Sequence, residues 1–168
     1  MENMEIEKKY TVKKLPDNLD SYSCKIIEQA YLNVSPAVRI RKSNDNYSLT
    51  YKGSGLMARE EYNLTLDKES YEHLLKKADG TIISKKRYLI PIEHPLFDDS
   101  CYPFVMPELF VELDVFDPPF APLIIAEVEF PSIELANAFI PLEWFDEEVT
   151  NNPEYHNSVM SQKTFSHE

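Results

Sequence analysis

Two glutamates and a lysine alternate with other residues in the stretch EIEKKY at positions 5–10. In an extended strand, side chains two residues apart point to the same side, so Glu5, Glu7 and Lys9 share one face. Such a charged stripe commonly faces water on an edge strand. The carboxylates can also act as oxygen ligands for a hard divalent cation.

The same spacing of charges recurs along the chain, in most segments with Val, Ile, Leu, Tyr or Phe between the charged positions. Each segment is mostly of one sign, and like charges side by side repel unless a group of opposite sign joins them. The basic positions are Arg39 and Arg41, Lys52, Arg59, and Lys85 and Arg87, and the acidic ones are Glu61, Glu112 and Asp114, and Glu127 and Glu129.

Two arrangements can explain this alternation. In the first, a sheet packs its apolar face on a core and exposes its charged face to water. In the second, a barrel turns its apolar positions outward under helices and lines a hydrated tunnel with the charged ones. Carboxylates suit Mg²⁺ or Mn²⁺, and the basic groups suit phosphate oxygens, which arginine can bind through two hydrogen bonds. A chain of phosphates that carries a divalent metal satisfies both sets.

Turn signals from Asn, Asp and Pro divide the chain into strands and a few helices. The fold class is therefore mainly β (α+β), and the pattern alone does not separate a sandwich from an up-and-down barrel. A turn, Gly53-Ser54-Gly55, joins two of the strands as in a hairpin. The expected strands are 3–13, 24–33, 36–43, 46–53, 57–66, 82–91, 108–117 and 123–131.

Helical signals are fewer. Asp67 can cap a helix that runs to Ala78 and stops at Gly80, and Ser132 can cap a second helix that ends before Pro141. Weaker signals predict a short helix at 17–22 and a C-terminal helix at 153–162.

Composition narrows the classes of function. The chain of 168 residues has 29 Asp and Glu against 17 Lys and Arg, a net charge of −12. Such a chain repels nucleic-acid phosphates and anionic lipids, so we expect no nucleic acid polymer and no membrane as partner. No apolar run approaches the ~20 residues of a membrane span, and no signal peptide precedes the strands. We expect a single cytoplasmic domain over residues 1–168.

The ordered segments resemble the CYTH superfamily, the triphosphate tunnel metalloenzymes. EIEKKY is similar to the E-x-E-x-K signature of the family, and VRIRK, LTYKG, AREEYN, SKKRY, VELDVF and IAEVEF follow in the family's order. The region from Trp144 to Asn157 is similar to the tail of short bacterial members. The resemblance covers nearly the whole chain, and it implies an eight-stranded antiparallel tunnel with a C-terminal helix near one mouth.

The resemblance also implies roles for individual residues. A triphosphate would lie in the tunnel and be hydrolysed with Mg²⁺ or Mn²⁺. The metal-site glutamates would be Glu5, Glu7 and Glu129, with Glu127 and Asp114 as neighbours that could serve a second metal. The basic lining would be Lys9, Arg39, Arg41, Lys52, Arg59, Lys85 and Arg87, with Glu61 and Glu112 orienting these bases.

The leading hypothesis is hydrolysis of a terminal phosphoanhydride, with inorganic tripolyphosphate or another triphosphate as the substrate. Glu127, or a second metal, would orient and deprotonate the attacking water, and Lys52 would protonate the leaving phosphate because neighbouring cations lower its proton affinity. Nucleoside or thiamine triphosphatases, a class IV-type adenylate cyclase and a polyphosphate- or nucleotide-binding module without turnover stay open as alternatives. The protein is expected to be a monomer or a homodimer.

The final predicted helix carries three residues that could reach the substrate. Tyr155, His156 and Asn157 could plug one tunnel mouth, or the helix could simply pack on the rim of the barrel.

Overall fold

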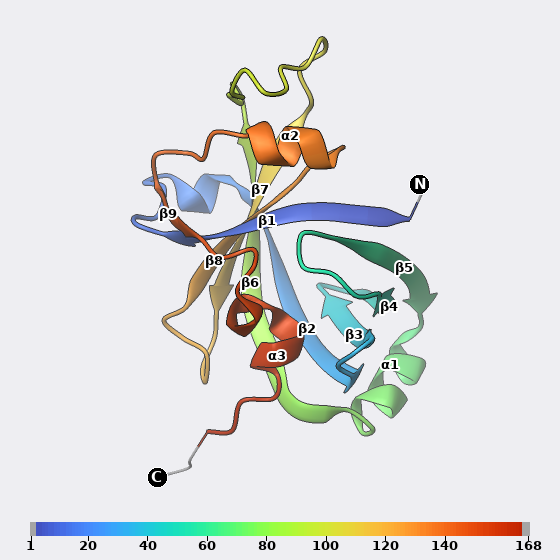
Figure 1. Ribbon diagram of the computed structural model, residues 1–168. Helices are drawn as coiled ribbons and strands as arrows, with labels where there is room; N and C mark the ends of the chain where they lie inside the picture. The colour runs from blue at the N-terminus through green and yellow to red at the C-terminus, as the bar shows by residue number, and fades with distance from the viewer. Residues whose placement is uncertain (1–2, 166–168) are drawn as a thin grey trace.

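The computed structural model describes residues 3–165, and β-strands make up most of this region (Figure 1). Eight strands match the predicted ones, with boundaries that differ by only a few residues. A ninth, β9, was not predicted, because its short and largely acidic sequence FDEE shows no apolar alternation. The strands are β1 (Met4–Val12), β2 (Ser23–Asn33), β3 (Ala37–Ser43), β4 (Asn46–Lys52), β5 (Ala58–Leu66), β6 (Asp79–Ile92), β7 (Leu109–Phe116), β8 (Ile124–Glu129) and β9 (Phe145–Glu148).

The sheet closes on itself as an antiparallel barrel. Its strands pair in the order β5-β4-β3-β2-β6-β7-β8-β1-β9, and a further pairing joins β5 to β1. Strand β1 makes this closure by dividing its length: residues 4–6 pair with β5, and residues 7–11 pair with β8. The architecture is therefore a closed eight-stranded barrel with one extra strand on β1, rather than a sandwich.

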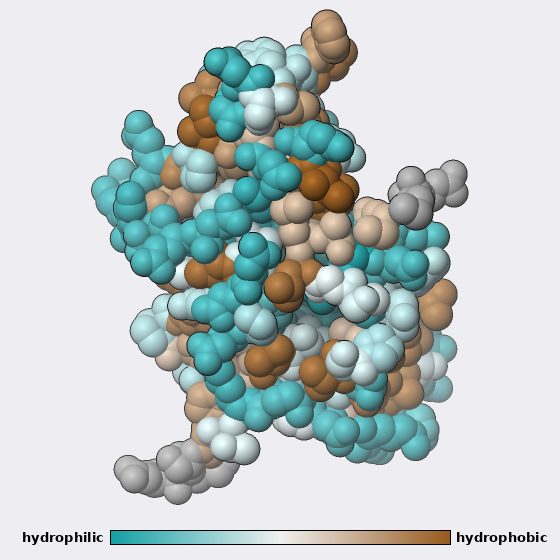
Figure 2. Space-filling view, viewed as in Figure 1, coloured by the Kyte–Doolittle hydropathy of each residue, from teal (hydrophilic) through white to brown (hydrophobic). Residues whose placement is uncertain are grey.

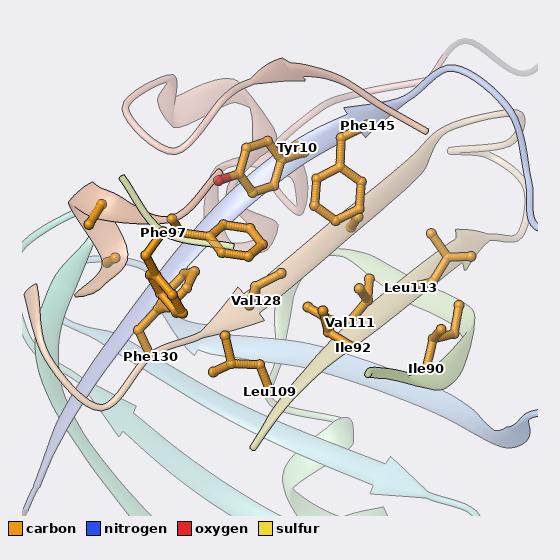
Figure 3. Close-up of a cluster of buried hydrophobic side chains, with 14 residues drawn as sticks. Tyr10, Ile90, Ile92, Phe97, Leu109, Val111, Leu113, Val128, Phe130 and Phe145 are labelled. Atoms are coloured by element: carbon orange, nitrogen blue, oxygen red, sulfur yellow. The ribbon is translucent and has the colours of Figure 1, made fainter. Parts of the chain in front are cut away.

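The largest apolar cluster lies outside the barrel, on the outer face of β1, β7 and β8 (Figure 3). Val111, Leu113 and Val128 alternate with the charged positions of their strands and have no exposed surface. Helix α2 (Ile133–Ala138) packs against β1 and adds Ala136 and Ala138 to this cluster, and the Ser132 hydroxyl caps it by accepting a hydrogen bond from the Leu135 amide at 3.1 Å. The apolar side of these strands thus faces outward, as the tunnel arrangement requires.

Helix α1 (Lys68–Leu75) covers the outer face of β3 and β4. Asp67 caps it as predicted and accepts a hydrogen bond from the Ser70 amide at 2.7 Å. The helix ends at Leu75 rather than Ala78. Gly80 instead lies at the start of β6 with a φ of 74°, where a side chain would strike the carbonyl oxygen of Ser161.

The predicted C-terminal helix is two short pieces, η2 (Pro153–Tyr155) and α3 (Asn157–Met160), because His156 between them is extended. The predicted helix at 17–22 is a single turn, η1 (Leu19–Ser21). Met160 of α3 packs with inward-facing residues of the barrel strands, among them Ile83 and Ile125. This apolar cluster fills one end of the barrel interior.

Helices cover only part of the outer surface, so the prediction of outward apolar positions under helices holds in part. Ile26, Tyr62 and Leu64 point outward and are 63%, 45% and 61% exposed. The connection between β6 and β7 also carries exposed apolar side chains, including Phe104, and it protrudes beyond α2 (Figures 1 and 2). No helix in residues 3–165 is long and apolar enough to cross a membrane.

Candidate functional site

The charged positions of the strands converge inside the barrel on a cavity of about 240 Å³. Every charged residue predicted for the site lines this cavity except Asp114, which lies behind the lining with no exposed surface. The strand alternation therefore places charged groups from different parts of the chain in one enclosed space. The lining consists of Glu5, Glu7, Lys9, Tyr31, Arg39, Arg41, Lys52, Arg59, Glu61, Asn63, Lys85, Arg87, Glu112, Glu127, Glu129 and Asn157.

Two lysines of the lining each contact a pair of carboxylates. Lys9 Nζ lies 2.8 Å from Glu127 and 3.6 Å from Glu7. Lys52 Nζ lies 2.8 Å from Glu5 and 3.3 Å from Glu61. The premise behind the predicted role of Lys52 as a proton donor is therefore wrong, because its ammonium group is surrounded by carboxylates and not by cations.

Asp114 forms the most buried ion pairs of the site. Its two carboxylate oxygens accept hydrogen bonds from Arg87 Nε and Nη2 at 2.7 and 2.8 Å, and Lys85 Nζ lies 2.7 Å from one of them. Arg87 also pairs with Glu112 and reaches Glu127 at 3.4 Å. Burial alone would raise the pKa of Asp114, but Arg87 and Lys85 lower it. This geometry argues against the prediction that Asp114 binds a second metal ion. Its carboxylate instead holds the side chains of Lys85 and Arg87 in place.

Three arginines of the lining have no carboxylate partner among residues 3–165: Arg39, Arg41 and Arg59. The Nε atoms of Arg39 and Arg59 are buried without a hydrogen-bond partner in this region. Burial and the nearby charges of Arg39 and Arg87 lower the pKa of Arg41 to about 9. Unsatisfied donors and mutual repulsion make these arginines chemically suited to bind an anion.

Neutral residues that the sequence reasoning missed position two of these arginines. Gln29 Oε1 accepts hydrogen bonds from Arg41 Nε and Nη2 at 2.9 and 2.6 Å, and Thr50 Oγ1 accepts one from Arg39 Nη2 at 3.3 Å. Both are almost fully buried. Thr50 lies two residues from Lys52 on β4, a parity that could have identified it, whereas β2 carries none of the predicted charged residues and gave no such signal for Gln29.

The cavity also carries carboxylates whose pKa values are raised. Burial raises the pKa of Glu7, and Glu127 adds to the shift. Glu129 lies at the mouth of the cavity, where partial burial and the carboxylates of Glu5 and Glu112 raise its pKa to about 7. A hard divalent cation would relieve this repulsion, and the metal role of Glu5, Glu7 and Glu129 stays a prediction.

These carboxylates are not gathered into a ligand cluster. In residues 3–165, no group of three His, Cys, Asp or Glu side chains is arranged to hold a metal ion. The ion pairs explain the arrangement, because Glu5 contacts Lys52 and Glu7 contacts Lys9. The pKa of Glu127 is well below its usual range: burial alone would raise it, but Lys9, Arg87 and Lys85 lower it. Glu127 is therefore a weak base, contrary to its predicted role in deprotonating water.

The C-terminal segment contributes one group to the cavity. Asn157 Oδ1 accepts hydrogen bonds from Gln29 Nε2 and Lys85 Nζ, both at 3.0 Å. His156 does not line the cavity; its Nε2 lies 2.8 Å from the Thr150 carbonyl oxygen, and Tyr155 packs against the apolar cluster that closes the barrel end. Of the three residues considered for a plug, only Asn157 lines the cavity; His156 contacts the backbone and Tyr155 packs on the apolar cluster.

Comparisons with known proteins agree with this arrangement. The family model described as "CYTH domain" matches residues 3–130. The chain is 34% identical over 160 residues to an inorganic triphosphatase of Nitrosomonas europaea, covering 94% of this chain and 96% of that protein. The crystal structure of the inorganic triphosphatase NE1496 superposes with a TM-score of 0.64 at 31% identity, covering 95% of both chains. A putative adenylate cyclase from Bacillus halodurans, 17% identical with a TM-score of 0.56 over 98% of this chain and 95% of its own, is similar in fold.

Proposed function

Since the chain belongs to the CYTH domain family, we propose that it is a divalent-metal-dependent hydrolase that releases orthophosphate from inorganic tripolyphosphate. The observation that carries this proposal is that one interior cavity holds both arginines without a carboxylate partner in residues 3–165 and carboxylates of raised pKa. A phosphate chain that carries a divalent metal complements both sets of groups.

The divalent metal would be Mg²⁺ or Mn²⁺. Glu5, Glu7 and Glu129 would hold it, with Glu127 close by at the β8 pairing with β1. Such an ion, when bound, neutralises phosphate charge and activates water. Lys52 and Lys9 would then move from carboxylates toward phosphate oxygens, which keeps the charge of the cavity balanced.

The chain's own residues bind and orient the phosphates. Arg39, Arg41 and Arg59 donate hydrogen bonds to the non-bridging oxygens. Water adds to the terminal phosphorus atom and the bridging P–O bond breaks, which yields orthophosphate and pyrophosphate. Burial lowers the pKa of Lys85 to about 7, with Arg87 and Arg41 adding to the shift and Asp114 opposing it. Lys85, like Lys52, contacts a carboxylate, that of Asp114 at 2.7 Å, and its lowered pKa makes it a further candidate for stabilising or protonating the leaving oxygen.

A substrate panel tests this function. Orthophosphate release should be fastest from tripolyphosphate with Mg²⁺ or Mn²⁺, and much slower from pyrophosphate, ATP and thiamine triphosphate. Faster release from ATP or thiamine triphosphate would reassign the substrate, and formation of cyclic AMP would make the protein a cyclase. Without release from any of them, stabilisation against heat by tripolyphosphate, about 2.7 kcal/mol at 100 times its dissociation constant, would identify a binding module instead.

The affinity for metal should depend on pH. Glu129 is protonated below its pKa of about 7, and a proton competes with a metal ion for the same oxygens. Mg²⁺ affinity should therefore fall as the pH is lowered from 8 to 6, by up to about tenfold per unit. Calorimetric titration in two buffers of different ionisation enthalpy measures the protons released. Proton release near pH 7 should disappear in Glu129→Gln, and its persistence in that variant would contradict the assignment.

We also propose that the protein has no nucleic acid or membrane partner, on the basis of its net charge of −12. A cytoplasmic location and a monomeric or homodimeric state are further proposals.

A further inference from the structure

A second cavity, of about 300 Å³, adjoins the first. The two share Arg41, Arg87 and Glu112, so the second is a continuation of the same interior space. The residues that it adds come from β2, β3, β4 and β6, and none of them belongs to the charged motifs that define the first cavity. They are Ser23, Lys25, Ile27, Ser43, Ser48 and Leu89.

The register of the strands places this second cavity at the open end of the barrel. Along β2, the inward positions run from Tyr31, in the apolar cluster that fills the closed end, through Gln29 and Ile27 to Lys25. Along β3 they run in the same direction from Arg39 through Arg41 to Ser43, since Gln29 pairs with Arg41 and Ile27 with Ser43. The two strands therefore form one wall of the barrel interior. Its basic side chains, Arg39, Arg41 and Lys25, follow one another from the interior to the mouth.

The basic side chains of this wall, Arg39, Arg41 and Lys25, form no ion pair with a carboxylate of residues 3–165. Lys25 is exposed at the mouth, makes no ion pair in residues 3–165, and pairs in register with Arg87 of β6. Glu112 supplies the single carboxylate of the described lining, and it contacts Arg87. The hydroxyls of Ser43 and Ser48 lie on the neighbouring strands and can donate hydrogen bonds to anionic oxygens.

From this arrangement we infer a subsite for a fourth phosphate, lined by Lys25, Ser43 and Ser48 and continuous with the triphosphate cavity through Arg41. The inference rests on the proposed function and extends its substrate class to linear polyphosphates longer than tripolyphosphate. The extra phosphate of tetrapolyphosphate adds one more negative charge, which Lys25 meets at the mouth. Water adds to a terminal phosphorus atom and the adjacent bridging P–O bond breaks, so that the products are orthophosphate and tripolyphosphate.

A comparison of two substrates tests this subsite. The kcat/KM values for tripolyphosphate and tetrapolyphosphate are measured with Mg²⁺ for the wild type, for Lys25→Gln and for Lys86→Gln. Lys86 is an exposed lysine on the outer face of β6, so its substitution makes the same change of charge away from the cavity. Lys25→Gln should lower the value for tetrapolyphosphate about fivefold more than the value for tripolyphosphate. Lys86→Gln should leave the ratio of the two values unchanged.

The possible failures can be told apart. A ratio in Lys25→Gln equal to that of the wild type, or a wild type that cleaves tripolyphosphate but not tetrapolyphosphate, overturns the subsite and leaves the proposed function intact. If neither compound is hydrolysed, the proposed function is wrong. Calorimetric affinities for the two polyphosphates then still test the subsite, because Lys25→Gln must weaken tetrapolyphosphate binding more than tripolyphosphate binding.

Discussion

Replacing Asp114 with alanine should lower the free energy of unfolding by about 3–5 kcal/mol. The carboxylate is fully buried and is the shared partner of Lys85 and Arg87, so its removal leaves the Lys85 ammonium group buried without a carboxylate. Urea denaturation followed by circular dichroism measures the change. Asp45→Ala, the same substitution at an exposed turn position that makes no ion pair with any of residues 3–165, should change stability by no more than about 0.5 kcal/mol.

The acid side of the stability profile gives an independent test of the Asp114 ion pairs. The pKa of Asp114 is below its ordinary value in the folded protein, so the stabilisation is present at neutral pH and is lost as pH falls through the acid range. The wild type should therefore lose stability more steeply than Asp114→Ala on acidification. Parallel profiles, together with a loss below about 1 kcal/mol at neutral pH, would show that the pair does not stabilise the barrel.

Substituting Glu7 with glutamine should lower kcat/KM for tripolyphosphate by at least about 100-fold. Glu7 is buried in the lining, pairs in register with Glu129, and is one of three carboxylates proposed to hold the metal. Loss of a group that only supports a metal ligand already costs about 10–100-fold in metal affinity or activity, so loss of a direct ligand should cost more. The amide keeps the shape of the side chain and removes its charge.

The matched control for Glu7→Gln is Glu60→Gln, which removes a carboxylate from the exposed outer face of β5. This control should retain wild-type kinetics. Part of the loss in Glu7→Gln should be recovered at higher Mg²⁺ concentration, because weakened metal binding is overcome by mass action. Near-normal turnover of Glu7→Gln at low Mg²⁺ would refute the metal assignment.

The alternation of charged and apolar residues was enough to predict the strands and the direction in which their side chains point. Val111, Leu113 and Val128 lie outside in the largest apolar cluster, while Glu112 and Glu127 line the cavity, as parity requires. The period of two is a local property of extended backbone, so it can be read from one segment at a time. The family resemblance then supplied the closure of the barrel, which alternation alone could not distinguish from a sandwich.

The sequence did not show which acidic and basic side chains form ion pairs with each other. These pairs depend on the register of the strands and on the shear of the barrel. Lys52 was expected among cations and lies between Glu5 and Glu61. Asp114 was expected beside a metal and lies behind Lys85 and Arg87. Residues without charge, such as Gln29, gave no chemical signal that would single them out.

The most direct test of the central claim uses the arginines. The sequence contains four, Arg39, Arg41, Arg59 and Arg87, and all of them line the cavity. Labelling with phenylglyoxal, followed by intact-protein and peptide mass spectrometry, reports their accessibility without interference from any arginine elsewhere on the molecule. If a metal–triphosphate complex binds inside the barrel, tripolyphosphate with Mg²⁺ should slow labelling of all four together. Unchanged labelling at a tripolyphosphate concentration that saturates hydrolysis would contradict the account, since the substrate would then lie outside the cavity.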